Sequence, residues 1–170
     1  MDSREYSFQG DGPDVHGDAT VSRESTLVGD VTVEADVTVW PGVVLRGDVG
    51  PVRLGTGSAI GDNAVLHAST VQREGMVGHG AVLNESAVER GAMVGFNATV
   101  SDARVGARSI VAMGTVVPSG YEIPPDSFAR GTPARVTPLS ETDIDRDGVF
   151  EQFASGEYAH LVDGHDDLFE

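Results

Sequence analysis

The sequence predicts a mainly β fold, a solenoid that turns a corner every six residues and stacks its inward side chains in ladders. Apolar residues recur at intervals of six between Val15 and Val117. A helix would repeat near 3.6 residues and a half-buried strand near 2, so neither alone explains this period. Only 6% of the residues are aromatic, as expected for a coil too narrow to hold a wide aromatic core. A short period maintained over this length is typical of a solenoid.

The predicted ladder consists of four runs separated by breaks. Its inward residues are Val15, Val21, Leu27, Val33, Val39 and Leu45, then Leu54, Ile60 and Leu66, then Met76, Val82, Val88, Val94 and Val100, and finally Val105, Val111 and Val117. These 17 positions, at three per coil, predict between five and six coils. Insertions in solenoids leave as loops on one face, which is often the functional face. The first two breaks lie beside Arg46, Asp48, His67 and His79.

The two ends of the chain are predicted to leave the coil. Residues 1–14 form an N-terminal arm, and the five prolines of residues 118–138 exclude a regular ladder or helix there, so this segment is predicted to be a strap. The predicted domains are therefore residues 1–138, the coil with its arm and strap, and residues 139–170, a helical segment that packs on the coil. Ser140 and Asp143 mark a helix start. The helical apolar stripe comprises Phe150, Phe153, Ala154, Tyr158, Leu161 and Val162, which Gly148 and Gly156 divide into two short helices, before a frayed tail at residues 165–167.

Charge and composition exclude several classes of partner. The chain carries 27 acidic residues and 11 basic residues, for a net charge of −16, and every basic residue is an arginine. Such a surface repels nucleic acid and anionic membranes, so neither is an expected partner. We interpret the acidity as adaptation to a cytoplasm of high salt, in which charges are strongly screened. The absence of cysteine excludes disulfide and thiolate sites, and the sequence shows no signal peptide or membrane span, so we expect a cytoplasmic protein.

Histidines are the obvious candidates for chemistry in a chain without cysteine. His67 and His79 each follow an apolar ladder stretch, where a coil of valines has no structural need for imidazole. His16, His160 and His165 are interpreted as solvated surface residues. Trp40 is interpreted as a packing residue at a corner.

Several stretches resemble the gamma-class carbonic anhydrases. They are residues 40–48 (WPGVVLRGD), Leu66-His67, Val77-Gly78-His79, Val94-Gly95 and residues 131–135 (GTPAR). The resemblance covers roughly residues 13–138, and its last motif is shared with hexapeptide acyltransferases. It implies a left-handed parallel β-helix of hexapeptide repeats, closed by a C-terminal α-helix and assembled as a homotrimer.

The resemblance also implies a divalent metal between subunits, zinc first, with iron or cobalt as alternatives. The positions that match its ligands are His67, the neighbouring subunit's counterpart of His79, and Asn84, where the family has a third histidine. A carboxamide oxygen is a much poorer zinc ligand than imidazole. Asn84 follows His67 by close to one complete coil, so the two side chains should stack on one face, whereas His79 should face another edge.

Three further residues match the family's catalytic surroundings: Arg46, Asp48 and Asp62. In the family the arginine and aspartate of the first pair link subunits near the metal, and the arginine holds bicarbonate. An intersubunit ion pair with no catalytic role explains the same two residues. Asp62 keeps the acid of the family's N-x-Q-D stretch, whose two amides are replaced by Ala59 and Gly61.

Three functions follow from these motifs. The first is a carbonic-anhydrase-like trimer that interconverts CO2 and bicarbonate, with activity reduced or lost because of Asn84. The second is a hexapeptide-repeat acyltransferase in which His67 or His79 acts as general base and acyl-CoA lies between subunits. The third is a trimeric homologue without metal or catalysis, which Asn84 and Gly61 favour.

Overall fold

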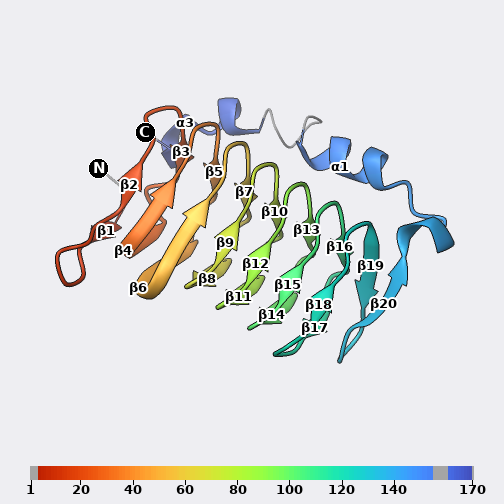
Figure 1. The fold of residues 1–170 in the computed structure, drawn as a ribbon. Coiled ribbons are helices and arrows are strands. Elements are labelled where there is room, and N and C mark those ends of the chain that lie inside the picture. The colour runs from red at the N-terminus through yellow and green to blue at the C-terminus, as the bar shows by residue number, and fades with distance from the viewer. Residues whose placement is uncertain (1–3, 155–160, 170) are drawn as a thin grey trace.

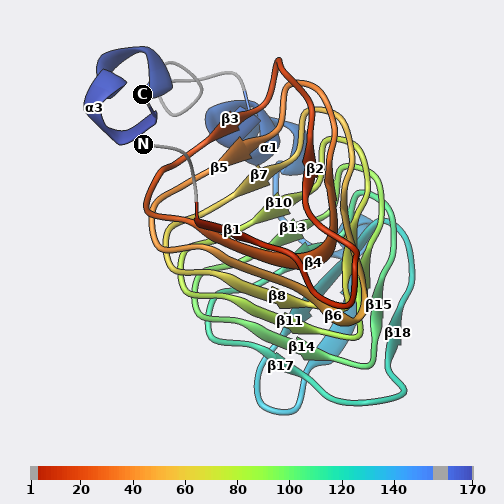
Figure 2. The ribbon, with the colours of Figure 1, turned by 90° about the vertical axis from the view of Figure 1, so that its left-hand side faces the viewer.

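The chain forms a β-solenoid whose coils have three flat sides, as the sequence predicts (Figures 1 and 2). The computed structural model describes residues 4–154 and 161–169. Each coil contributes short strands to two parallel sheets, one of eight and one of twelve strands. The buried ladder residues of all coils meet inside as one continuous apolar core.

We call the three sides faces 1, 2 and 3. Face 1 is the eight-stranded sheet, made of β3 (Thr20–Val21), β5 (Thr38–Val39), β7 (Ala59–Ile60), β10 (Met76–Val77), β13 (Met93–Val94), β16 (Ile110–Val111), β19 (Ser127–Arg130) and β20 (Arg135–Pro138). Face 2 contains β8 (Val65–His67), β11 (Val82–Asn84), β14 (Thr99–Ser101) and β17 (Val116–Val117). Face 3 contains β9 (Thr70–Val71), β12 (Ala87–Val88), β15 (Arg104–Val105) and β18 (Glu122–Ile123).

Two long strands, β4 (Thr26–Val33) and β6 (Val44–Leu54), pass from face 2 to face 3 and join them into the twelve-stranded sheet. The N-terminal arm adds β1 (Arg4–Tyr6) and β2 (Asp14–Val15) to β4. The break after Leu45 is a true insertion, because the pairing of β4 with β6 shifts between Gly29 and Val31. At that point a Cβ on Gly47 would overlap the backbone of Asp30, so the close approach of the two strands requires glycine.

The ladder departs from the predicted register between Leu66 and Val88, and the predicted inward residues from Val88 to Val117 are buried. Val77 and Leu83 are the buried residues, at 3% and 0% exposure, whereas Met76 and Val82 face outward. The prediction that Met76 and Val82 point inward was therefore wrong. The sequence suggested a long break after Leu66. The chain instead forms one short side of the coil, whose inward residues are Leu66 and Val71. The next coils are one residue shorter than three full hexads, as the pairings of Leu54 with Val71 and of Val71 with Val88 show, and the last coil is full length again, since Val105 pairs with Ile123.

The coil also extends beyond Val117, which corrects the prediction of a strap over the whole of residues 118–138. Ile123 and Ala129 are buried ladder residues, and β18 and β19 pair in parallel with the preceding coil. Prolines are tolerated here because Pro118, Pro124 and Pro125 follow strands at corners, where no ladder N–H is required. Only β20 runs antiparallel, so the other seven strands of face 1 mark seven coils, more than predicted.

The C-terminal segment returns along face 1 from the last coils to the first (Figures 1 and 2). It contains η1 (Leu139–Glu141), α1 (Arg146–Ala154), η2 (Val162–Gly164) and α3 (Asp166–Phe169). The first α-helix begins at Arg146, later than the predicted start at Ser140, and Asp145 Oδ1 caps it by accepting the N–H of Gly148 at 3.1 Å. The predicted frayed tail is instead helix α3. Tyr158, Gly156 and His160 lie outside the described residues.

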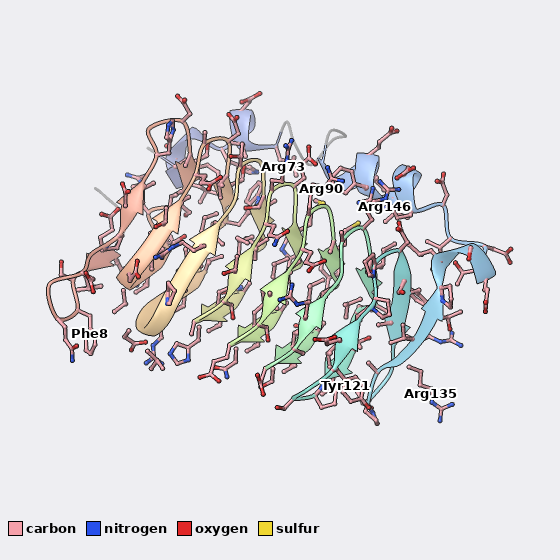
Figure 3. The ribbon with its side chains drawn as sticks, viewed as in Figure 1. Phe8, Arg73, Arg90, Tyr121, Arg135 and Arg146 are labelled. Carbon is pink, nitrogen blue, oxygen red and sulfur yellow. The ribbon has the colours of Figure 1, made fainter. Side chains whose placement is uncertain are left out.

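Two sets of contacts hold this segment on the coil. Arg146 donates to the carbonyl of Gly91, and Asp147 pairs with Arg108 at 3.1 Å. Figure 3 shows Arg146 on α1, and Arg73 and Arg90 on the edge of the coil near this segment. At the other end, the ring of Phe169 meets that of Trp40 edge-on at 5.5 Å. Among the described residues no helix has the length and apolar content needed to cross a bilayer.

Candidate functional site

Arg46, His67 and Asn84 form an outward column on face 2, at one position of three successive coils. Arg46 pairs with His67 across β6 and β8, and His67 pairs with Asn84 across β8 and β11. The residue before each of them is a fully buried leucine: Leu45, Leu66 and Leu83. Because side chains alternate along a strand, the polar residues point outward. The stacking of Asn84 on His67 expected from the spacing is confirmed.

The imidazole of His67 lies between two oxygen atoms. Its Nε2 is 3.0 Å from Asp48 Oδ1, and its Nδ1 is 3.1 Å from Asn84 Oδ1. Asp48 is also bound through Oδ2 by the Arg46 guanidinium, at 2.5 Å. The side chains of His67 and Asp48 are mostly buried, with 21% and 17% of their surface exposed, while Arg46 is half exposed. Since an ionised carboxylate only accepts, Nε2 carries a proton in this arrangement.

The Arg46 guanidinium is the main reason why the pKa of Asp48 lies below its usual value. Its hydrogen bond makes the largest contribution, and its charge and the bond to His67 lower the pKa further, against a smaller opposing effect of burial. Asp48 is therefore ionised at neutral pH. Arg46, Asp48 and His67 thus place a positive, a negative and a polar group next to one another at the surface of the coil.

The lowered pKa of Asp48 predicts acid sensitivity. Because the folded pKa is below the unfolded value of about 3.9, the carboxylate stabilises the fold above about pH 4, and this contribution is lost as the pH falls through the folded pKa. Asp48→Asn should make the pH dependence of the urea midpoint shallower below pH 4. Asp11→Asn, at an exposed position with no ion pair among the described residues, should leave it unchanged. Identical curves for wild type and Asp48→Asn would contradict the assignment.

His79 lies at a different corner, between faces 1 and 2, beside Asp62 of the preceding coil. Its Nδ1 is 3.0 Å from the backbone nitrogen of Asp62 and 2.9 Å from Asp62 Oδ2. An unprotonated Nδ1 accepts the amide hydrogen, whereas a protonated one donates to the carboxylate, so Asp62 orients the ring in either state. His67 and Asn84 end β8 and β11 at the corner with face 3, so one chain does not bring all three predicted ligands together.

Phe96, to which no sequence motif pointed, stacks its ring on that of His79. The two centroids are 4.9 Å apart and the planes differ by 16°. Gly61 lies on the other side, and a Cβ there would come within 2.7 Å of His79 Nδ1. Glycine recurs once per coil at this place, at Gly61, Gly78 and Gly95, and this recurrence is visible in the sequence and could have revealed the crowded corner.

The donor set fits two positions of a metal site. Histidine ligands usually give one ring nitrogen to the metal and donate the other N–H to a carboxylate. His67 has this arrangement, with Asp48 on Nε2 and with Nδ1 3.1 Å from Asn84 Oδ1, and ligands of one zinc ion are roughly 3 Å apart. His79 has a carboxylate at Nδ1 and its Nε2 available. Among the described residues, no three His, Cys, Asp or Glu side chains of a single chain are grouped to hold a metal.

The other two described histidines, His16 and His165, take no part in these clusters. His16 is exposed, and its Nδ1 accepts the N–H of Asp18 at 3.1 Å. His165 is exposed and meets Trp40 edge-on at 6.4 Å. His160 lies outside the described residues.

Proteins similar to this chain include a carbonic anhydrase and transferases. Over 64 residues the chain is 38% identical to the uncharacterized transferase YtoA of Bacillus subtilis and 34% identical to a carbonic anhydrase of Geobacillus kaustophilus. Each match spans 38% of this chain and 37% or 35% of the relative, so it covers about a third of the curated proteins. A hexapeptide transferase family protein from Anaplasma phagocytophilum has a TM-score of 0.86 at 25% identity, over 95% of this chain and 98% of that one. No protein-family profile matches the chain.

Proposed function

Since the chain belongs to the hexapeptide-repeat family of left-handed β-helix proteins, we propose that it is a carbonic-anhydrase-like trimer with a divalent metal between its copies. The observation that carries the proposal is the pairing of each candidate histidine with its own carboxylate, His67 with Asp48 and His79 with Asp62. Two such pairs at the two edges of face 2 suit a site formed where one copy's His67 corner meets another copy's His79 corner.

Face 2 has the character of a surface that associates with a second copy. Its outward positions form a mainly apolar row of Val44, Val65, Val82, Thr99 and Val116, two of which, Val82 and Val116, are 37% exposed. The equivalent row on face 3 ends in Arg104 and Glu122. An exposed apolar row beside the candidate ligands supports burial of face 2 between copies.

Val82→Glu tests this association. A carboxylate buried without a partner costs several kcal/mol, so the variant should be monomeric at concentrations where the wild type has three times the 17.7 kDa mass of one chain. Ala87→Glu, at an outward position of face 3, is the matched control and should remain trimeric. The masses follow from sedimentation velocity. A monomeric wild type, or a trimeric Val82→Glu, would argue against face 2 as the interface.

In the proposed site, His67 Nδ1 and Asn84 Oδ1 of one copy and His79 Nε2 of another would hold the metal. When bound, the metal would supply an acidified water as the nucleophile for CO2. Asp48 would keep a proton on His67 Nε2, and the Asp62 carboxylate would accept the proton of His79 Nδ1 when Nε2 binds the metal. Arg46, half exposed next to Asp48, is placed to hold the bicarbonate anion.

Asn84 sets the expected level of activity. Amide oxygen suits harder ions better than it suits zinc, so we expect weak zinc binding and slow hydration. Metal analysis of the purified protein, together with stopped-flow CO2 hydration, tests the proposal. We expect substoichiometric metal that is lost in His67→Ala and in His79→Ala. Metal binding that persists in both variants would refute the site.

One observation favours acyl transfer as a second candidate function. The bond from His67 Nε2 to Asp48 is the arrangement in which a carboxylate orients a histidine base, leaving Nδ1 to accept a proton from an alcohol or amine. Consumption of an acyl-CoA that depends on both His67 and Asp48, and that persists after treatment with a chelator, would support this function over CO2 hydration.

A further inference from the structure

The corner that carries His79 is a column of side chains from four successive coils. Asp62, His79, Phe96 and Met113 occupy equivalent positions, as their backbone bonds show: the carbonyls of Asp62, His79 and Phe96 accept the N–H groups of Gly80, Asn97 and Gly114 at 2.8–2.9 Å. Within this column the His79 ring contacts Asp62 of the coil before it and Phe96 of the coil after it. The imidazole of His79 therefore contacts two neighbouring coils, while nearly half of its side chain stays exposed.

Two neighbouring coils determine the space available to the His79 ring. Phe96 stacks on one side at 4.9 Å between centroids, nearly parallel at 16°. On the other side, the space is available only because residue 61 is glycine, since a Cβ there would be 2.7 Å from His79 Nδ1. Gly78 does the same for Phe96, because a Cβ on Gly78 would be 2.8 Å from Phe96 Cδ1. The glycines thus allow the two rings to lie against each other.

Of the two nitrogens of the His79 ring, Nδ1 contacts Asp62 and Nε2 is available. Asp62 contacts Nδ1 through its amide at 3.0 Å and its carboxylate at 2.9 Å. Nε2 has no hydrogen-bond partner among the described residues, and 45% of the side chain is exposed. The stack and the contact with Asp62 together leave Nε2 as the ring nitrogen that can reach a ligand outside the chain.

We propose that Phe96 is a positioning residue for His79, holding the imidazole so that Nε2 points out of its own chain toward the shared metal site. This inference rests on the proposed function. A ligand that must reach across an interface is bound more tightly when its side chain is already ordered, because less rotational entropy is lost on binding. A stacked ring pair contributes about 0.5–1.5 kcal/mol, which corresponds to roughly twofold to twelvefold in affinity.

The test uses the full chain and titration with Co2+, read by calorimetry and by the visible spectrum of the bound ion. Phe96→Leu, which has no flat face, should weaken Co2+ binding by roughly twofold to twelvefold and alter the spectrum. Phe96→Tyr, which keeps the flat face, should restore both to wild-type values. Phe128→Leu, at a partly buried aromatic position of face 1 in a later coil, is the control and should change neither. If Phe96→Leu folds poorly, Phe96→Met provides the same comparison with a flexible side chain of similar volume.

His79→Ala separates the inference from the function on which it rests. If His79→Ala abolishes Co2+ binding while Phe96→Leu binds Co2+ with wild-type affinity and spectrum, the positioning role is wrong and the metal site stands. If Co2+ binding is unaffected by His79→Ala, both are wrong. Weaker binding in Phe96→Leu that Phe96→Tyr restores would establish Phe96 as a positioning residue.

Discussion

Asn84→His is expected to raise metal affinity by more than about 100-fold and to bring measurable CO2 hydration, because it replaces an amide with a third imidazole. Loss of even an outer-shell partner costs a metal site roughly 10- to 100-fold, and a ligand counts for more. Position 84 is suitable, since its backbone pairs with that of His67 and its side chain already lies 3.1 Å from His67 Nδ1. Metal content by mass spectrometry and hydration by stopped flow give the two readouts.

The matched control for this variant is Ser101→His. Ser101 pairs with Asn84 in the next coil, so a histidine there stands in the same column but one coil farther from His67. It should add neither metal nor activity. If Asn84→His also gains nothing, or if Ser101→His gains as much, Asn84 does not occupy a ligand position and the shared metal site is wrong.

Ile123→Ala is expected to destabilise the protein by about 2–5 kcal/mol, the usual cost of removing a large aliphatic side chain from a packed core. Ile123 is only 2% exposed and pairs with Val105 of the preceding coil. The variant leaves a cavity in the last part of the ladder, which the narrow coil cannot close without moving its corners. The free energy of unfolding, measured in urea at one fixed protein concentration, gives the effect.

Glu122→Ala is the control, since Glu122 is exposed next to Ile123 on the same strand. It should change stability by less than about 0.5 kcal/mol. Equal effects of the two substitutions would mean that the ladder ends before Pro118, as the prolines alone suggested, and not at Ala129 as observed.

The period of six determined the solenoid and much of its core. From Leu27 to Leu66 every predicted inward residue is buried, because a β-strand places alternate side chains on opposite sides and the corners keep this alternation in phase. The spacing of close to one coil between His67 and Asn84 likewise predicted their stacking, since residues one coil apart pair across neighbouring strands.

The pattern missed the register only between Leu66 and Val88, since the predicted inward residues from Val88 to Val117 are buried. Met76 and Val77 are both apolar, as are Val82 and Leu83, so hydrophobicity alone could not say which of each pair turns inward. The backbone settled it, because the pairing of Met76 with Ala59 and of Val82 with Val65 aligns each strand with the coil before it. In the same way, prolines at corners were mistaken for the end of the coil.

By itself the sequence determined the repeating coil, its ladder and the residue types at the site, because these depend on local spacing along the chain. The tertiary structure alone decided which groups meet there: Asp48 reaches His67 through an insertion in β6, and Phe96 covers His79 where Gly61 leaves room. Such contacts join residues about a whole coil apart, and their geometry is fixed by how closely successive coils stack and not by any local preference.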